Sequence, residues 1–378
     1  MSILRDSKEH CKNIRMAQIP QKSKCKSEIE FERDRQYETK WIWYHTILAA
    51  VAEFSTIRQS LNLLFIFIFA SLVGCTISLP YLPESQQLER GSLPQPDVAL
   101  DIPYLRSCTD SPVHTLKFNS SYPVTVLVHG CNGSAGRFRS LAQLYAFHGQ
   151  QAVCFSYNDR DSLVDISGQL ITALDSLASL MSNRNLTVIG HSLGGLVARK
   201  AMERDRRSEW QNDDVSIKLV TVSAPFAGIE IASPCGNKFL HWLSLGTVPG
   251  ICWGISGDNW YEITPASNFI RYPEPLIQSV QRYLKVVTDE RDTCRRKSKN
   301  ESCIESDHVF SLAEQYHPII DNYKKLINVE VEAGHVEIVG YKHVAPRKLL
   351  SILQQQGMLA ATPPERRVAL ERLLAKLF

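Results

Sequence analysis

The stretch at residues 186–199 constrains the fold of this chain more than any other part of its sequence. It begins as an apolar, β-branched run, which is typical of a strand buried on both faces. It then turns through Gly190, Ser192 and Gly194 and continues with residues that suit a helix. The two glycines remove bulk on either side of the serine, which a sharp turn requires. The stretch therefore predicts a buried strand, a tight turn and a helix, with the Ser192 hydroxyl presented at the turn.

Strands and helices alternate along most of the chain that surrounds this stretch. Apolar runs predict strands at residues 124–128, 152–156, 217–222, 283–288 and 328–332, and helical patterns lie at residues 138–148, 164–181 and 347–355. Such alternation predicts an α/β fold with a mostly parallel central sheet and helices on both of its faces. At the end of the chain, residues 366–378 predict a basic amphipathic helix that packs on the domain.

Residues 226–275 break the alternation. They carry Trp242, Trp253 and Trp260 among glycines and prolines, so they are too apolar for a disordered loop. Long insertions of this kind are usually functional. We expect a lid beside the functional site.

Composition excludes several classes of function. The hydrophobic content of 44% and the charged content of 21% are ordinary for a globular protein, and the formal net charge of +3 is too small to indicate nucleic-acid binding. The sequence contains no zinc-type Cys/His spacing, no phosphate-binding loop and no dinucleotide glycine motif. We expect no nucleic-acid partner, no metal and no organic cofactor.

The N-terminal part of the chain has two sections of opposite character. Residues 1–60 are mixed in charge and slightly basic, and we do not expect them to fold on their own. Residues 61–79 are apolar, and no charged residue lies between Arg58 and Glu84. This pattern predicts a poorly structured extension followed by a membrane-inserting signal or anchor segment.

Two interpretations of the apolar segment remain open. Its end resembles a bacterial lipoprotein signal with Cys75 as the lipidated residue, which would require a start later than Met1, for example at Val51. Alternatively, the segment stays in the membrane as an anchor. Both place the following part outside the cytoplasm, in the periplasm or at the cell surface, and tethered to the membrane. Residues 80–101 then predict a linker, and residues 102–378 the catalytic domain.

Residues 123–353 resemble the α/β-hydrolase superfamily, and more narrowly its bacterial lipases and esterases of the triacylglycerol lipase type. The resemblance rests on the glycine-flanked Ser192 between strand and helix, on His129-Gly130 after the strand at 124–128, and on a Gly-His pair after the last strand. It implies the α/β-hydrolase fold, a Ser-acid-His order of catalytic residues and hydrolysis of carboxylic esters through an acyl-enzyme.

The resemblance assigns the base and the acid by position. His335, directly after the last strand, is the expected base, and His343 is its rival. Asp307 is the expected acid, because its surroundings resemble the acid loop of the family. Asp289 and Asp292 compete with it, since they lie closer to the end of the preceding strand.

The same resemblance places an oxyanion hole at two backbone amides. One belongs to Leu193, which follows the nucleophile, and the other to Cys131, which follows His129-Gly130. A lipid or other ester substrate is implied, and the apolar lid favours a lipid acyl chain. Acyltransferases and thioesterases use the same triad, and a non-catalytic surface-binding module remains a further alternative.

The cysteines fit an oxidising compartment. We expect Cys294–Cys303 to close an excursion in the acid loop and Cys235–Cys252 to staple the lid. Cys154, on a buried strand, is expected to be an ordinary core residue.

Overall fold

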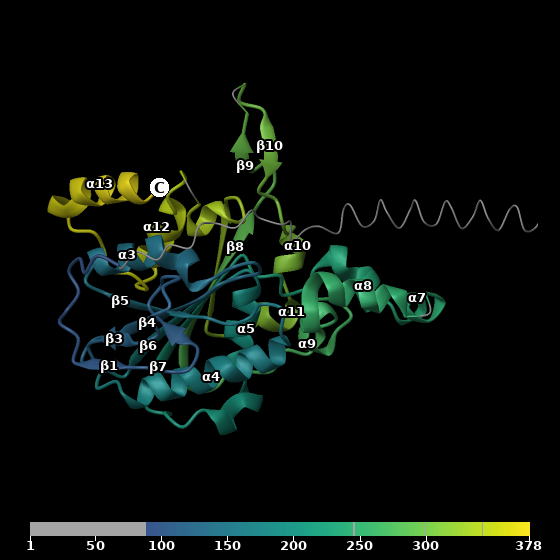
Figure 1. Ribbon diagram of the computed structural model, residues 1–378, viewed down its shortest axis with the longest axis horizontal. Coiled ribbons are helices and arrows are strands. Elements are labelled where there is room, and N and C mark those ends of the chain that lie inside the picture. The colour runs from purple at the N-terminus through teal and green to yellow at the C-terminus, as the bar shows by residue number, and fades with distance from the viewer. Residues whose placement is uncertain (1–87, 245, 299, 342) are drawn as a thin grey trace, which may run out of the picture. The chain divides into compact units, whose positions relative to one another are not determined.

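The computed structural model describes residues 88–378 except 245, 299 and 342. Its centre is a seven-stranded sheet in the order β11-β8-β7-β6-β4-β5-β2 (Figure 1). Neighbouring strands are parallel except for the edge strand β2, which is antiparallel to β5. The strands of this sheet are β2 (Leu105–Arg106), β4 (Val124–Val128), β5 (Gln151–Phe155), β6 (Asn185–His191), β7 (Ser216–Val222), β8 (Val280–Asp289) and β11 (Leu326–Glu332).

Helices cover both faces of the sheet (Figure 1). Side chains alternate along β4, so that Val126 packs in the cluster on the face of α4 (Leu163–Ser179) and α5 (Leu193–Ala201). Leu127 packs in the cluster on the opposite face, which is covered by α3 (Arg139–Phe147), α12 (Arg347–Gln355) and α13 (Arg367–Leu377). The predicted α/β fold, with its mostly parallel sheet and two helical layers, is thus confirmed.

Shorter elements connect these layers. Two antiparallel pairs lie outside the main sheet, β1 (Val98–Leu100) with β3 (Leu116–Phe118), and β9 (Cys294–Lys297) with β10 (Cys303–Ser306). The short helices outside residues 226–275 are η1 (Ala135–Phe138), η2 (Arg204–Glu209), α10 (Leu312–Gln315), α11 (Pro318–Asp321), η5 (Glu337–Val339) and η6 (Pro364–Arg366).

The expected lid is a series of short helices on one side of the sheet (Figure 1). These are η3 (Glu230–Ala232), α6 (Ser233–Gly236), α7 (Lys238–Leu243), α8 (Thr247–Ser256), η4 (Gly257–Trp260) and α9 (Asn268–Arg271). The Cys235–Cys252 disulfide joins α6 to α8. At the base of the insertion, the Arg160 guanidinium donates to the carbonyl oxygens of Gly254 and Ile255 at the end of α8. The insertion is therefore fastened both internally and to the loop after β5.

The structure corrects the expected start of the domain. Residues 80–101 were expected to be a linker, yet β1 falls within them and pairs with β3. Asp97 also accepts hydrogen bonds from the backbone and the hydroxyl of Ser120. The apolar run of β1 is only three residues long and lies in a polar stretch, so it was too short to predict a strand. The folded part therefore begins before residue 102.

The cysteines also bring one correction. The predicted Cys235–Cys252 and Cys294–Cys303 disulfides are present, but Cys154 is not an ordinary core cysteine, because it is bonded to Cys108. Arg106 of β2 pairs with Cys154 of β5, which brings the chain two residues later close enough for the bond. Among the cysteines that the structure describes, only Cys131 is in no disulfide.

The predicted N-terminal extension and the apolar segment at residues 61–79, with Cys75, lie outside the described residues. From residue 88 onward, the described part of the chain holds no helix that is long and apolar enough to cross a bilayer. The C-terminal helix α13 packs with Leu373 and Leu374 against the core cluster of α3 and α12, as predicted for the tail.

Candidate active site

Ser192 occupies the turn between β6 and α5 in a strained backbone conformation, with φ of 56° and ψ of −127°. A positive φ at a residue with a side chain costs about 1–3 kcal/mol and persists only where the surroundings impose it. Here the Ser192 amide donates to the carbonyl of Val222 at 2.9 Å, and its carbonyl accepts from the amide of Gly195 at 2.9 Å. The turn predicted from the sequence is thus formed and held on both sides.

The two glycines that flank Ser192 are required by close backbone approaches. A Cβ atom on Gly190 would lie 2.2 Å from the carbonyl oxygen of Gly194. A Cβ atom on Gly194 would lie 2.2 Å from the carbonyl oxygen of His129. Any side chain at either position would therefore separate the strand, the helix and the loop that follows β4.

That loop lies directly against Ser192. A Cβ atom on Gly130 would be 2.8 Å from the Ser192 Cβ, so the two backbones touch. The loop is fixed from behind, because Tyr157 donates its hydroxyl hydrogen to the carbonyl of His129 at 2.5 Å and stacks on the His129 ring. The Asp159 carboxylate accepts from the amide of Asn132.

This arrangement brings together the two residues expected to form an oxyanion hole. Cys131 follows Gly130 in the loop, and Leu193 is the first residue of α5. First-turn amides of a helix have no acceptor within the helix, and the helix dipole favours negative charge near them. The assignment of the donors remains a prediction.

His335 follows β11, as predicted, and its ring is held by a carboxylate that the sequence analysis did not consider. The Nδ1 atom lies 2.8 Å from Oε1 of Glu290 and 2.8 Å from the hydroxyl of Ser223. Glu290 is the first residue after β8 and is 1% exposed. Phe310 packs edge-on against the same imidazole.

The Glu290 carboxylate is surrounded by donors. Its Oε1 accepts from the hydroxyls of Ser223 at 2.7 Å and Thr288 at 2.9 Å. Its Oε2 accepts from the amides of Val309 at 2.6 Å and Phe310 at 2.8 Å. Burial alone would raise the pKa of Glu290, but His335 and the other donors outweigh it and lower that pKa below its ordinary value. The Glu290 carboxylate is therefore ionised at neutral pH.

The structure places Asp307 elsewhere than predicted. Its carboxylate accepts from the backbone amides of Val336 and Glu337 at 3.1 and 3.0 Å and from Arg295 at 3.0 Å. It contacts the loop of His335 rather than the imidazole. The physical reason is that Glu290 already fills the position beside Nδ1, while the amides after His335 form a site for a second carboxylate.

The other candidates from the sequence do not approach the ring of His335. Asp289 is paired with the exposed Arg291, and Asp292 lies in the turn beyond it with φ of 59°. His343 is exposed. Glu290 stands between the two aspartates just after β8, and residues 283–288 of that strand are all buried, so no alternation of buried and exposed positions marks it. The sequence alone carried no signal that distinguishes Glu290 from its two neighbours.

His191, the residue before Ser192, supports the same loop. Its Nε2 donates to the carbonyl of His335 at 2.8 Å, and the two rings are 4.8 Å apart between centroids. Burial, together with the nearby His335, lowers the pKa of His191 to about 3. The His191 ring is thus neutral at physiological pH and acts as a hydrogen-bond donor.

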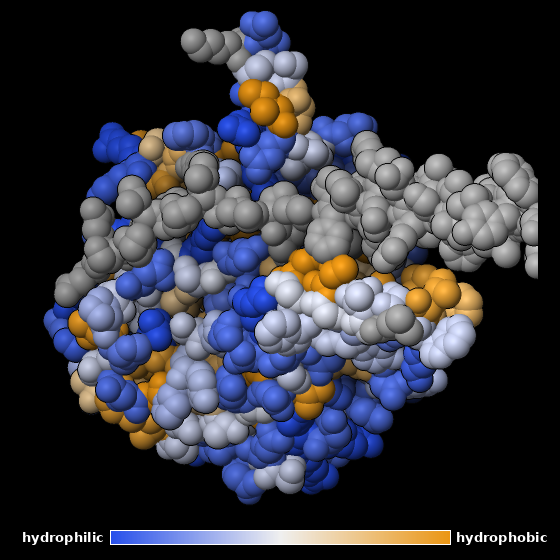
Figure 2. Space-filling model, turned by 45° about the vertical axis from the view of Figure 1, so that its right-hand side comes forward, coloured by the Kyte–Doolittle hydropathy of each residue, from blue (hydrophilic) through white to orange (hydrophobic). Residues whose placement is uncertain are grey.

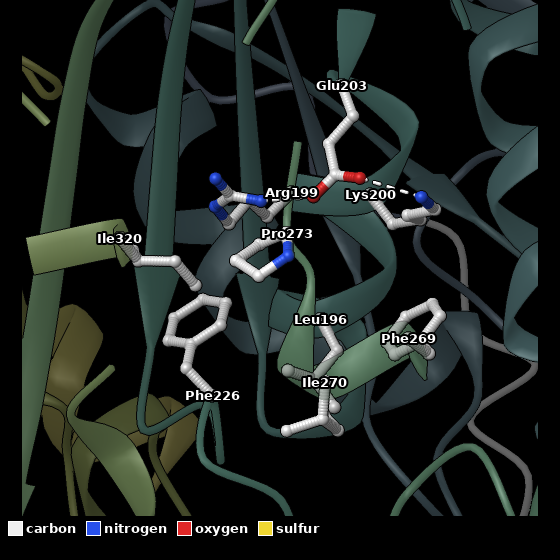
Figure 3. A pocket seen from close by; sticks show the side chains of 9 residues that line it. All are labelled: Leu196, Arg199, Lys200, Glu203, Phe226, Phe269, Ile270, Pro273 and Ile320. Atoms are coloured by element: carbon white, nitrogen blue, oxygen red, sulfur yellow. Dashed lines mark hydrogen bonds and ion pairs between the residues drawn. The ribbon is translucent and has the colours of Figure 1, made fainter. Parts of the chain in front are cut away.

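A small crevice beside α5 does not belong to this site (Figure 3). It is lined by apolar side chains and by the ion pair of Arg199 with Glu203, to which Lys200 also binds. Its volume of ≈ 20 Å³ is enough for a water molecule but not for an acyl chain. In the described part of the chain, no cluster of His, Cys, Asp or Glu is arranged to hold a metal ion.

A family model described as "Putative serine esterase (DUF676)" matches residues 120–252, about a third of the chain. The match includes Ser192, Cys131 and Leu193 but ends before Glu290, Asp307 and His335. Among curated proteins, none has a sequence that matches this chain.

Several solved structures resemble the chain at low sequence identity. The mature lipase BlEst2 of Bacillus licheniformis is 14% identical with a TM-score of 0.42, and the alignment covers 63% of this chain and 92% of the lipase. The lin2722 gene product of Listeria innocua is 14% identical with a TM-score of 0.40, covering 64% and 96%. The NocB thioesterase domain from the nocardicin cluster is 15% identical with a TM-score of 0.36, covering 63% and 95%. None of them is similar enough to define a substrate for this chain.

Proposed function

We propose that this chain, which has the α/β-hydrolase fold, is a serine hydrolase that cleaves carboxylic esters with Ser192, His335 and Glu290 as its catalytic triad. The observation that carries the proposal is the buried His335–Glu290 pair beside a strained serine turn. Burial of a carboxylate is unfavourable in free energy unless its charge is compensated. Glu290 is buried among five hydrogen-bond donors, and one of them, the His335 ring, can take up a compensating positive charge. The match of residues 120–252 to a serine esterase model supports the same reaction.

In the proposed reaction, Ser192 Oγ attacks the ester carbonyl carbon while His335 Nε2 takes the hydroxyl proton. Glu290 accepts the Nδ1 hydrogen bond, which keeps the proton of the neutral ring on Nδ1 and stabilises the imidazolium. The amides of Leu193 and Cys131 bind the carbonyl oxygen as it becomes negative. His335 then protonates the departing alcohol, and a water molecule, activated by the same ring, releases the acid from the acyl-enzyme.

The lid supports an apolar acyl chain as the substrate. Trp242 is 74% exposed, and Phe239, Leu243 and Trp253 on α7 and α8 are also exposed. Figure 2 shows hydrophobic surface on the side of the molecule that carries these helices. Large exposed apolar groups in a cluster mark binding surfaces in soluble proteins. We therefore propose a lipid or other long-chain ester rather than a small polar one.

We also propose that the apolar segment at residues 61–79 tethers the domain to a membrane with the catalytic part outside the cytoplasm. The support is the uncharged stretch between Arg58 and Glu84, together with three disulfides in the described part of the chain. Membrane fractionation and protease treatment of intact cells test this. A full-length protein recovered in the soluble fraction with its domain protected from added protease would contradict it.

The hydrolase proposal is tested with p-nitrophenyl esters of increasing chain length, from acetate to palmitate, on the wild type and Ser192→Ala. We expect hydrolysis by the wild type, a rate that rises with chain length, and loss of activity in the variant with an unchanged circular dichroism spectrum. A fluorophosphonate should label the wild type and not the variant. Activity retained by Ser192→Ala would refute the mechanism.

A further inference from the structure

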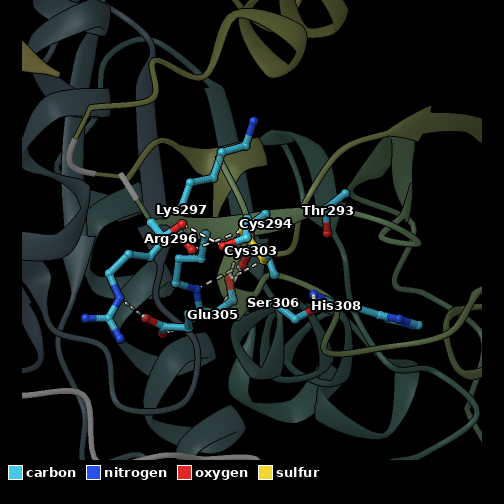
Figure 4. Close-up of a disulfide and its surroundings, with 12 residues drawn as sticks. Thr293, Cys294, Arg296, Lys297, Cys303, Glu305, Ser306 and His308 are labelled. Atoms are coloured by element: carbon cyan, nitrogen blue, oxygen red, sulfur yellow. Dashed lines mark hydrogen bonds and ion pairs between the residues drawn. A yellow bond between two sulfur atoms is a disulfide. The ribbon is translucent and has the colours of Figure 1, made fainter. Parts of the chain in front are cut away.

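The hairpin β9–β10 interrupts the segment that carries both carboxylates of the site. It begins shortly after Glu290, ends just before Asp307 and projects from the sheet beyond β8 (Figure 1). The Cys294–Cys303 disulfide joins its two strands (Figure 4). Glu290 follows β8 directly and does not need this hairpin in order to reach His335. We therefore infer the role of the hairpin from its contacts.

Asp307, at the end of the hairpin, holds the backbone of the His335 loop. Its own carbonyl accepts from the amide of His335 at 2.9 Å, and its carboxylate accepts from the next two amides, those of Val336 and Glu337. Asp307 is 2% exposed. A Cβ atom on Gly334 would lie 2.1 Å from its Oδ2, which shows how closely the loop is packed on this carboxylate. Three consecutive amides, the first of them that of the base, are thus fixed by one residue.

Arg295 connects the hairpin to Asp307. Its guanidinium donates from Nε to the Asp307 carboxylate at 3.0 Å and from Nη1 to Glu305 at 3.2 Å. The Arg295 side chain is 17% exposed, whereas that of the next residue, Arg296, is 63% exposed and pairs with Glu305 rather than with Asp307 (Figure 4). Exposed ion pairs contribute little, but a charge pair with one buried partner fixes geometry.

The base of the hairpin also reaches the acid. Thr293 donates from its hydroxyl to the carbonyl of Glu290 at 2.6 Å, and its own carbonyl accepts from the amide of Asp307 at 3.2 Å. Thr293 therefore contacts both the backbone of Glu290, the proposed acid, and the backbone of Asp307, which binds the His335 loop. Movement of the hairpin would change the position of both relative to Ser192.

We propose that Arg295 and Asp307 are positioning residues for His335, and that the hairpin, closed by its disulfide, holds Arg295 against Asp307. This inference rests on the proposed hydrolase function. Neither residue contacts the imidazole ring, so neither donates nor accepts a proton in the reaction. They hold the loop that carries His335 against Glu290 and against His191, the residue before Ser192.

The test compares two charge removals on the same strand, Arg295→Gln and Arg296→Gln. Both lose one positive charge from the hairpin, but only the first loses the contact to Asp307. We expect kcat to fall about 10- to 100-fold in Arg295→Gln with KM nearly unchanged, because small displacements of a catalytic group act on the chemical step. Arg296→Gln should match the wild type. Arg295→Lys, which keeps the charge but not the planar fork, should recover part of the rate.

A double-mutant cycle tests the role of the disulfide. Cys294→Ser/Cys303→Ser should lower kcat in the same direction as Arg295→Gln, and the two changes together should be less than additive, because they act through one contact. All rates are normalised to sites labelled by a fluorophosphonate, so that loss of folded protein does not imitate loss of kcat. If Arg295 and the disulfide only stabilised the fold, their loss would lower the number of labelled sites and leave kcat per site unchanged.

Equal kcat per site in Arg295→Gln and Arg296→Gln would overturn the inference, as would fully additive effects in the cycle. If the wild type itself neither hydrolyses esters nor reacts with the fluorophosphonate, the proposed function fails and the inference fails with it. An active wild type with an unaffected Arg295→Gln overturns the positioning role alone.

Discussion

Replacing Glu290 by Gln separates the geometry found in the structure from the one expected from the sequence. The substitution keeps the shape of the side chain and removes its charge. The amides of Val309 and Phe310 are fixed donors to one oxygen, so the amide oxygen of Gln must face them. Its NH₂ group then faces Nδ1 of His335, which can accept this hydrogen only as the tautomer with its proton on Nε2.

That tautomer cannot take a proton from Ser192. Loss of the correct tautomer in a Ser-His-acid triad lowers kcat by about 10⁴-fold. We therefore expect kcat/KM of Glu290→Gln to fall about 10³- to 10⁴-fold, which corresponds to about 4–5.5 kcal/mol of transition-state stabilisation. The free energy of unfolding should change by only about 1–3 kcal/mol, since the cavity stays filled and most hydrogen bonds can be kept.

The assay is hydrolysis of a p-nitrophenyl ester by Glu290→Gln, with Asp289→Asn as the matched control. Asp289 is the preceding residue in the chain, but its carboxylate pairs with the exposed Arg291 and makes no contact with His335, so the control should keep its activity. Asp307→Asn should be intermediate. An active Glu290→Gln beside an inactive Asp307→Asn would show that Asp307 is the acid after all and refute the assignment made from the Nδ1 contact.

Three further predictions follow from the described contacts. The pKa of Glu290 is lower in the folded protein than its ordinary value of 4.5, so the unfolded chain takes up a proton first as the pH falls. The free energy of unfolding should therefore decrease below about pH 4.5, and less steeply in Glu290→Gln, as measured by urea unfolding. Cys108→Ser/Cys154→Ser opens a link across 46 residues and should cost about 4 kcal/mol, whereas an unchanged urea midpoint would contradict the disulfide. Phe239→Ser/Trp242→Ser should slow long-chain esters at least several-fold and leave acetate hydrolysis unchanged; equal losses on both would count against a role for the lid in chain binding.

Most of the sheet could be predicted from the sequence because its strands are buried on both faces. The strands β4, β6 and β7 are buried along most of their length, and their apolar, largely β-branched residues are typical of a parallel sheet. The pairing of β1 with β3 could not be predicted in the same way. Each of its strands is only three residues long, too short for a clear pattern, and their pairing is set by the tertiary fold.

The same difference applies to the candidate site, where local patterns predict some residues and tertiary packing determines others. Ser192 and His335 could be placed because each follows a strand and has glycine one or two residues away, where the local backbone geometry leaves few choices. The partner of His335 depends instead on which way a side chain turns after β8. Asp289, Glu290 and Asp292 are equivalent in composition, and only the three-dimensional packing shows that Glu290 points inward.

The two carboxylates near His335 explain why sequence position alone could not choose between them. Glu290 binds the ring, and Asp307 binds the backbone that carries the ring. Each is buried, and each has several donors, so removal of either leaves unpaired groups in a region closed to water. The functional difference between the two carboxylates lies in the positive charge beside each of them. Asp307 is neutralised permanently by Arg295, whereas Glu290 has no such cation among the donors described for it and gains one only when His335 takes a proton. A carboxylate whose counter-charge appears during the reaction stabilises the transition state, whereas one whose counter-charge is always present can only hold a fixed geometry, here that of the His335 loop.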